Sequence, residues 1–455
     1  MHGSGRRSIE LLNCGTIPPA MEWLEHLDKL RGKLKISGLE DVSHPESAGK
    51  AKLWRKSNIQ MLELFWRPYI EDHNHNGIEI LEGLKPHSNL KSLTIEGFRC
   101  SSFPSWMVTK NHLSGLYNLV KIKLGNMPYS LRKLDLRDMN ELSEWSDAMI
   151  QSNSSSVNLF PLLEKLYLCG LPKLELLPNL GDVKCLQSLI IECCQNLTCL
   201  PISKELVSLQ KLVIHSCPNL TSLFSEDFDE GLQGFGSIES IDLRSCPNLV
   251  GVPEIHRLQS LRQLLIEGCD RVLASCMRLE TLTSLEKLMI TSSPRFWPTD
   301  LQNLSSLTSL YIGCFDWFDD DVEPLDYFPW HDSKSGGGTS GSNNNIQPCF
   351  VSLTSLELSG WRNLKSLPEP IQYISALRNL TIKRFHGLEA LPEWLGKIPC
   401  LKILELLYCS NLKQLPNLTN LQQLSIWYCP LLEQRCAKDI GAEWHKIAHI
   451  PYIKM

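Results

Sequence analysis

The chain has 455 residues, 43% of them apolar, and its 45 basic and 50 acidic side chains leave a net charge of −5. This apolar content is typical of folded globular proteins and excludes a chain that is disordered along its whole length. The mild acidity, without a block of basic residues, argues against nucleic acid as a partner. No apolar run approaches the roughly 18 residues of a spanning helix, so we expect no integral membrane segment.

The first residues contain two arginines but no continuous apolar stretch behind them, so they do not resemble a secretion signal. The chain has 17 cysteines, none of them in a Cys-x-x-Cys pair. Without an export signal these are expected to be reduced thiols. The sequence therefore predicts a cytoplasmic protein.

The motif L-x-x-L-x-[L/I] recurs along nearly the whole chain. Its middle apolar residue falls at positions 166, 189, 212, 241, 264 and 288, which are 23, 23, 29, 23 and 24 residues apart. It falls again at 356, 380 and 404, which are 24 and 24 apart. A period of about 20–29 residues is the signature of leucine-rich repeats. The alternation within L-x-L indicates a strand with one apolar face.

One such strand and its return loop cannot bury an apolar face alone, so successive coils must stack over a shared leucine core. We predict an α/β solenoid, a leucine-rich-repeat horseshoe with a parallel β-sheet on the concave side. The convex segments are expected to be mostly irregular or short helices. Leu212, Leu264 and Leu404 should be almost fully buried, because each occupies the middle of its strand motif.

The predicted organisation has three parts: a lead-in at 1–28, the solenoid at 29–429 and a C-terminal cap at 430–455. Within the cap, we expect residues 436–453 to fold back over the last strand. Trp444 should act as the main apolar plug there, with Glu443 and Lys446 among the solvent-facing residues.

Two places interrupt the solenoid. Near 119–136, the copies centred on Ile122 and Leu134 are 12 residues apart, too few to close a coil of this period. Either one copy is not a core strand or a segment has been lost. Residues 315–348 contain an acidic and aromatic run followed by a Gly/Ser/Asn-rich stretch, which predicts a mobile insertion loop.

Several residue patterns could bind a metal, and each has a simpler structural interpretation. A cysteine recurs five residues after the middle leucine, once per coil, whereas zinc ligands pair two to four residues apart. A buried turn suits these thiols better. His445 and His449 lack the glutamate and third ligand of a zinc protease. The acidic residues between Asp316 and Glu323 lack a calcium-loop pattern. We expect no metal and no cofactor. The recurring cysteines are Cys194, Cys217, Cys246, Cys269, Cys409 and Cys429.

Three stretches resemble the leucine-rich region of plant intracellular nucleotide-binding leucine-rich-repeat disease resistance proteins, the coiled-coil subtype in particular. They are the opening from Leu30 to Trp66, the recurring L-x-I-x-x-C-x-x-L-x-x-L-P coil, and the ending from Cys429 to Pro451. The resemblance covers about residues 20–455. It implies a sensor of pathogen effectors or of a guarded host protein. It also implies an autoinhibitory contact with the nucleotide-binding domain of the same or a related receptor.

The phosphate loop G-x-x-x-x-G-K-[ST] of that family's switch is absent from this sequence, so ATP binding is not expected. No arrangement of Ser, His, Asp or Cys stands out as catalytic, and we expect no enzyme. Two alternatives stay open. An extracellular repeat receptor would need an export signal and repeated copies of the motif G-x-I-P, which occurs only at Gly15–Pro18 and Gly396–Pro399. A substrate adaptor such as an F-box protein would need an adaptor helix before the repeats.

The residues between the strand leucines point to the concave side, where solenoids bind their partners. We expect about a quarter of them to contact a protein partner, since Tyr, Trp and Arg are the usual interface anchors. The candidates are Lys165, Tyr167, Lys211, His215, Asp242, Arg244, Lys287, Tyr311, Glu357, Lys383, Glu405, Trp427 and, in the adjoining turn, Tyr428.

Overall fold

The computed structural model divides the chain into two compact units, described separately below. Unit 1 comprises Met1–Ile238 with Ser245–Pro253, and unit 2 comprises Glu239–Arg244 with Glu254–Met455. The insertion expected at 315–348 lies outside the described residues. The structure describes residues 9–11, 21–42, 44–66, 77–98, 104–108, 116, 118–125, 132–147, 162–177, 183–200, 206–222, 236–250, 255, 258–275, 279–291, 301, 304–313 and 350–455.

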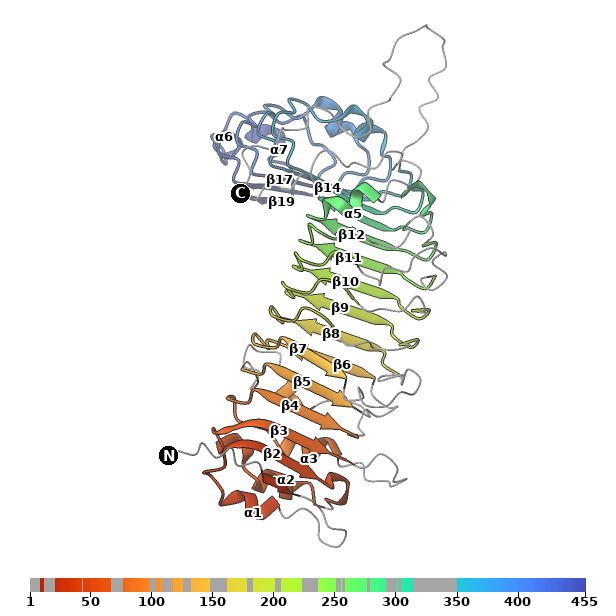
Figure 1. Cartoon of the computed structure of the whole chain (residues 1–455). Helices are drawn as coiled ribbons and strands as arrows, with labels where there is room; N and C mark the ends of the chain where they lie inside the picture. Colours follow the sequence, from red (N-terminus) through yellow and green to blue (C-terminus); the bar gives the residue numbers. More distant parts are fainter. Residues whose placement is uncertain are drawn as a thin grey trace. The chain divides into compact units, whose positions relative to one another are not determined.

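Unit 1 contains parallel strands that pair coil by coil (Figure 1). One set runs in the order β1-β2-β3-β4-β5-β7, and the other in the order β6-β8-β9-β10. The strands are β1 (Ile9–Leu11), β2 (Gly32–Ser37), β3 (Ile59–Phe65), β4 (Ser92–Glu96), β5 (Lys121–Gly125), β6 (Lys133–Arg137), β7 (Glu144–Asp147), β8 (Lys165–Cys169), β9 (Ser188–Glu192) and β10 (Lys211–His215). The helical segments are α1 (Met21–Glu25), η1 (Leu39–Asp41), α2 (Glu46–Lys50), η2 (Leu53–Arg55), α3 (Gly77–Gly83) and α4 (Ser105–Val108).

The two copies only 12 residues apart belong to different sheets. Ile122 in β5 pairs with Trp145 in β7, whereas Leu134 in β6 pairs with Leu166 in β8. Ile122 and Leu134 are both buried, so each copy is a core strand. Twelve residues need not close a coil here, because the second copy begins a new sheet. Strand β7 (Glu-Trp-Ser-Asp) lacks the leucine motif. The sequence pattern therefore could not predict that β5 pairs with β7 and not with β6.

Unit 2 is a parallel sheet in the order β11 to β19, with each strand paired to the next. The strands are β11 (Ser240–Arg244), β12 (Gln263–Glu267), β13 (Lys287–Thr291), β14 (Ser309–Gly313), β15 (Ser355–Ser359), β16 (Asn379–Lys383), β17 (Ile403–Leu407), β18 (Gln423–Trp427) and β19 (Tyr452–Lys454). The helical segments are α5 (Asp270–Ser275), η4 (Leu279–Thr281), η6 (Glu369–Tyr373), η7 (Glu393–Lys397), α6 (Pro430–Arg435) and α7 (Trp444–Ile447).

The leucine core follows the predicted register. Leu212 is 2% exposed, and Leu264 and Leu404 are fully buried. Their strands pair without slippage, Leu380 with Leu404 and Leu404 with Leu424. In the five-residue strands the second and fourth residues point into the core, as the period of two requires. Within the part of the chain that the structure describes, no helix is long and apolar enough to cross a membrane.

The recurring cysteines are all buried at the turn that ends each strand. The Sγ of Cys217 lies 3.3 Å from the carbonyl oxygen of His215, and the Sγ of Cys269 lies 3.4 Å from that of Glu267. The thiols of Cys194, Cys409 and Cys429 likewise donate a weak hydrogen bond to the carbonyl two residues earlier, whereas Cys246 donates to the carbonyl of Ile214 at 3.8 Å. The structural interpretation of these cysteines is therefore confirmed.

The C-terminal cap folds back on the last coils, but its plug is not the predicted one. Trp444 is only half-buried, while Ile447 and Ile450 are buried. Glu443, expected to face solvent, is buried and accepts a hydrogen bond of 3.0 Å from the backbone N–H of Leu415. The cap must satisfy the polar backbone of the coil beneath it, which an apolar plug alone cannot do.

Gly396 in η7 lies where the next coil passes closely. A Cβ at this position would overlap the backbone carbonyl oxygen of Asn417. We expect Gly396→Ala to lower the free energy of unfolding by about 1–3 kcal/mol, because backbone must move to admit the methyl group. Urea denaturation measures this. The matched change Gly49→Ala, in α2, meets open space and should stabilise slightly; equal effects would contradict the expectation.

Candidate protein-binding surface

All 13 candidate residues lie on or directly beside the sheet face opposite the leucine core, which we call the open face. Twelve occupy the first, third or fifth position of a strand, and Tyr428 follows β18. None is fully buried. Unit 1 holds Lys165, Tyr167, Lys211 and His215, and unit 2 holds Asp242, Arg244, Lys287, Tyr311, Glu357, Lys383, Glu405, Trp427 and Tyr428.

In unit 1, a buried carboxylate orients an arginine on the open face. Asp135 is 2% exposed and accepts two hydrogen bonds from Arg137, at 2.7 Å to Nε and 3.3 Å to Nη2. Lys133 lies 3.0 Å from the same carboxylate. The guanidinium of Arg137 stacks 3.9 Å from the ring centroid of Tyr167. Charge-assisted bonds and the cation–π contact together fix this arginine in one orientation.

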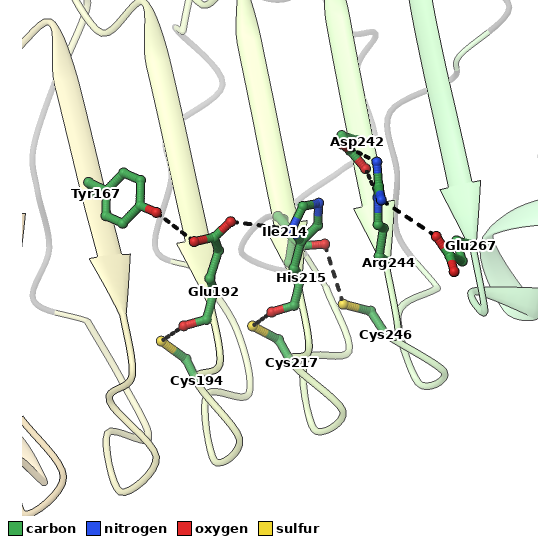
Figure 2. A network of polar contacts seen from close by, with 10 residues as sticks. All are labelled: Tyr167, Glu192, Cys194, Ile214, His215, Cys217, Asp242, Arg244, Cys246 and Glu267. Atoms are coloured by element: carbon green, nitrogen blue, oxygen red, sulfur yellow. Dashed lines mark hydrogen bonds and ion pairs between the residues drawn. The ribbon is translucent and has the colours of Figure 1, made fainter. Parts of the chain in front are cut away.

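The polar contacts of Tyr167 extend across β8, β9 and β10 (Figure 2). The hydroxyl of Tyr167 donates to Glu192 at 2.6 Å, and Nδ1 of His215 lies 3.3 Å from the other oxygen of that carboxylate. Burial and the neighbouring Glu192 raise the pKa of Tyr167, so it remains a hydroxyl donor at neutral pH. These side chains form a pre-oriented polar surface with one aromatic centre.

A row of lysines runs beside this network. The first strand positions pair Lys133 with Lys165 and Ser188 with Lys211 across neighbouring strands. Lys165 and Lys211 are exposed, and neither forms an ion pair with any residue the structure describes. Two free ammonium groups on one row favour acidic groups on a partner.

In unit 2, β11 repeats the motif of an aspartate that orients an arginine. Asp242 accepts hydrogen bonds from Arg244 at 2.7 and 3.0 Å, and Arg244 lies 3.7 Å from Glu267 (Figure 2). Further along, Tyr311 and Glu357 are half-buried on the third strand position. Burial raises the pKa of Glu357, Lys383 opposes this shift, and Glu405 adds to it.

Three aromatic side chains are exposed at the ends of β17 and β18. Tyr408 is 40% exposed, Trp427 42% and Tyr428 66%. The rings of Tyr408 and Tyr428 stack with centroids 4.6 Å apart and planes 4° apart. Both residues have a φ of 57°, a left-handed conformation that costs a non-glycine residue about 1–3 kcal/mol.

The repeat pattern predicted only part of this surface. It missed Asp135, Arg137, Glu192, Glu267 and Tyr408, which occupy the same repeat positions as residues that it named. Arg137 was missed because its strand lies in the irregular segment near 119–136. Tyr408 could have been found, because it stands at the same position after β17 as Tyr428 after β18.

The open face carries charged, hydrogen-bonding and aromatic groups. Among the described residues, no group of three or more His, Cys, Asp or Glu side chains could hold a metal ion. A ring nitrogen of His449, one of the two histidines considered for zinc, lies 3.0 Å from the carbonyl oxygen of Leu418. That imidazole serves the packing of the cap.

The repeated parallel coils define a leucine-rich-repeat solenoid with a polar and aromatic open face. Residues 21–152 and 369–429 match the family model described as R13L1/DRL21 leucine-rich repeats. The disease resistance protein RGA2 of Solanum bulbocastanum is 43% identical over 100 residues, which cover 21% of this chain and 10% of that protein. From the same plant, the disease resistance homologue RGA1 is 29% identical over 434 residues, which cover 94% of this chain and 34% of that protein.

The disease resistance protein RPP5 of Arabidopsis thaliana is 31% identical over 192 residues, which cover 41% of this chain and 13% of that protein. The chain is similar to the leucine-rich-repeat regions of plant disease resistance proteins. It spans between about a tenth and a third of the length of these relatives.

Proposed function

We propose that this chain is the recognition and regulatory module of a plant intracellular immune receptor. It binds a pathogen effector or a guarded host protein, and it restrains a nucleotide-binding domain until that partner arrives. The module acts by binding, without catalysis, in the cytoplasm. The similarity to disease resistance proteins supports this role.

The observation that most supports a binding role is the pre-oriented open face of unit 1. Arg137, Tyr167 and Glu192 are each held by at least two contacts before any partner is present. Ordering side chains on binding costs roughly 0.5–1.5 kcal/mol each, and groups already held avoid much of that loss. Arginine and tyrosine are also the residues most often central to protein interfaces.

The regulatory part of the proposal can be tested with a relative. The chain is co-expressed with the segment of RGA1 that lies outside the matched region, and their association is measured by co-precipitation and titration. We expect binding that weakens at least about tenfold in Lys165→Glu/Lys211→Glu, because the free ammonium groups favour an acidic partner.

The matched control is Lys365→Glu/Lys397→Glu, which reverses the same charge at exposed positions away from the open face. This control should bind within about twofold of the parent chain, as expected for charges outside the contact. Absence of binding by the parent chain, or equal weakening by both double variants, would refute the regulatory contact through this face.

A further inference from the structure

Five side chains on the open face of three neighbouring strands form a surface that we call the β8–β10 platform: Lys165, Tyr167, Ile190, Lys211 and Val213. The three strands pair in parallel without a shift in register (Figure 1). Lys165 and Lys211 therefore lie in one row, on either side of Ser188. The other three residues form the next row, two positions further along their strands.

The two lysines of the platform lack the carboxylate partner that the other lysines of their row possess. In the remaining coils of unit 1, each lysine that the structure describes in this row lies within ion-pair distance of a carboxylate. The pairs are Lys33 with Glu63 at 2.8 Å, Lys121 with Glu144, and Lys133 with Asp135 at 3.0 Å. Lys165 and Lys211 are exposed, and neither forms an ion pair or a side-chain hydrogen bond with any residue that the structure describes.

The row beside the lysines explains why they lack partners. In the other coils of unit 1 this row carries polar side chains, and two of them, Glu63 and Asp135, are the partners named above. In β8, β9 and β10 the row holds Tyr167, Ile190 and Val213 instead. Tyr167 and Ile190 are half-buried and Val213 is 6% exposed, so the row forms a largely apolar floor. The platform therefore has the lysines of the repeat without the carboxylates that neutralise them elsewhere.

The charges around the platform do not neutralise it. On the open face of β6, β8, β9 and β10, four lysine and arginine side chains face two carboxylates. Each carboxylate on these strands or directly before them already has a partner. The contacts are Asp135 with Lys133 and Arg137, Glu164 with Arg132, and Glu192 with Tyr167 and His215. Glu192 lies at the carboxyl end of β9 (Figure 2), roughly 13 Å along the strand from the lysine row. The lysine row therefore complements acidic groups on a partner.

We propose that the β8–β10 platform binds an amphipathic α-helix of a partner protein, in which two acidic residues seven positions apart lie beside an apolar stripe. Strands lie about 4.8 Å apart, so Lys165 and Lys211 are roughly 10 Å apart. Seven residues of helix rise about 10.5 Å. Apolar residues four and eight positions after the first acidic residue then lie beside the acidic pair, over the apolar floor. This inference rests on the proposed function and specifies the form of one partner contact.

Two features favour a helix over an extended segment. In an extended chain the side chains on one face are roughly 6.6 or 13 Å apart, and neither spacing matches that of the two lysines. Ile190 and Val213 also offer no hydrogen-bonding side-chain groups, so a backbone that covers them has to satisfy its own N–H and C=O groups. A helix does so internally. The platform therefore fits a helix that lies across the strands.

The test selects binders on the full chain from two phage-displayed libraries, a helical scaffold with one randomised face and random dodecapeptides with a central proline, which cannot be helical throughout. We expect the helical library to yield the tighter binders, with Asp or Glu at two positions seven apart beside apolar residues. On Lys165→Glu/Lys211→Glu, the acidic pair should be replaced by lysine or arginine. No binders from the helical library, a different motif, equally tight proline peptides, or an unchanged motif on the reversed variant would each overturn the proposal.

A second variant tests the apolar floor. In Ile190→Thr, which keeps a β-branched residue in the strand, affinity for the selected helix should fall at least about fivefold, because apolar contact area is lost. Val207→Thr, at an exposed valine outside the strands, is the control and should leave affinity unchanged. Retained affinity in Ile190→Thr would overturn the proposal. Loss of the RGA1 contact with helix binding intact would refute only the regulatory role, and the reverse outcome would refute only this inference.

Discussion

Replacing Leu404 with alanine is expected to lower the free energy of unfolding by about 2–5 kcal/mol. Leu404 is fully buried in β17, between Leu380 of β16 and Leu424 of β18. Rigid neighbouring coils limit how far the cavity can collapse, so the lost packing adds to the lost burial. Because each coil contacts mainly its neighbours, the damage should centre on these three strands.

Hydrogen exchange combined with urea denaturation measures this effect. Amide protection in β16, β17 and β18 should fall most in Leu404→Ala. Gln422→Ala, at an exposed position just before β18, is the control and should change stability by less than about 0.5 kcal/mol. A cost as small as that of the control would mean that Leu404 does not belong to the core.

The core could be predicted because its signal repeats. Most coils bury the same strand positions, so all motif copies report one structure, and Leu212 and Leu264 fall where the register places them. The pairing of β5 with β7, in place of the next motif strand β6, could not be predicted in this way. The buried Trp145 of β7 carries no repeat signal, and its pairing with β5 depends on contacts distant in sequence.

The open face was predictable as a set of positions but not as a set of contacts. Alternation along a strand fixes which residues face outward, and this placed Tyr167 and His215 correctly. It does not reveal that Glu192 joins these two, because that contact depends on the rotamers of three side chains on three strands. The aromatic stack likewise requires the positive φ of Tyr408, which sequence alone does not give for a tyrosine.

Replacing Glu443 with alanine should lower the free energy of unfolding by about 2–3 kcal/mol, because it leaves the buried N–H of Leu415 unpaired and removes the counter-charge of the partly exposed Arg435 and Lys446. Oε2 of Glu443 lies 2.9 Å from Lys446 and accepts the N–H of Leu415 at 3.0 Å, while Oε1 lies 3.4 Å from Arg435. Arg435 and Lys446 also donate to the carbonyls of Lys413 and Leu415. The carboxylate thus joins the cap to the coil beneath it.

Urea denaturation measures this loss. Glu389→Ala is the matched control, since Glu389 is an exposed partner of Lys413 at 3.2 Å and should contribute less than about 1 kcal/mol. A cost for Glu443→Ala no larger than that of the control would show that the cap is held by its apolar residues alone.

The contribution of Glu443 should also depend on pH. Burial disfavours its charged form, but the hydrogen bonds from Leu415, Lys446 and Arg435 and the charge of Lys446 outweigh burial and lower its pKa. The unfolded chain, with an ordinary glutamate pKa of about 4.3, then takes up the proton more readily than the folded chain. The stabilisation is therefore complete above about pH 5 and is lost as the pH falls through the folded pKa. Stability curves of the parent chain and Glu443→Ala should converge toward acid, and curves that stay parallel would contradict this assignment.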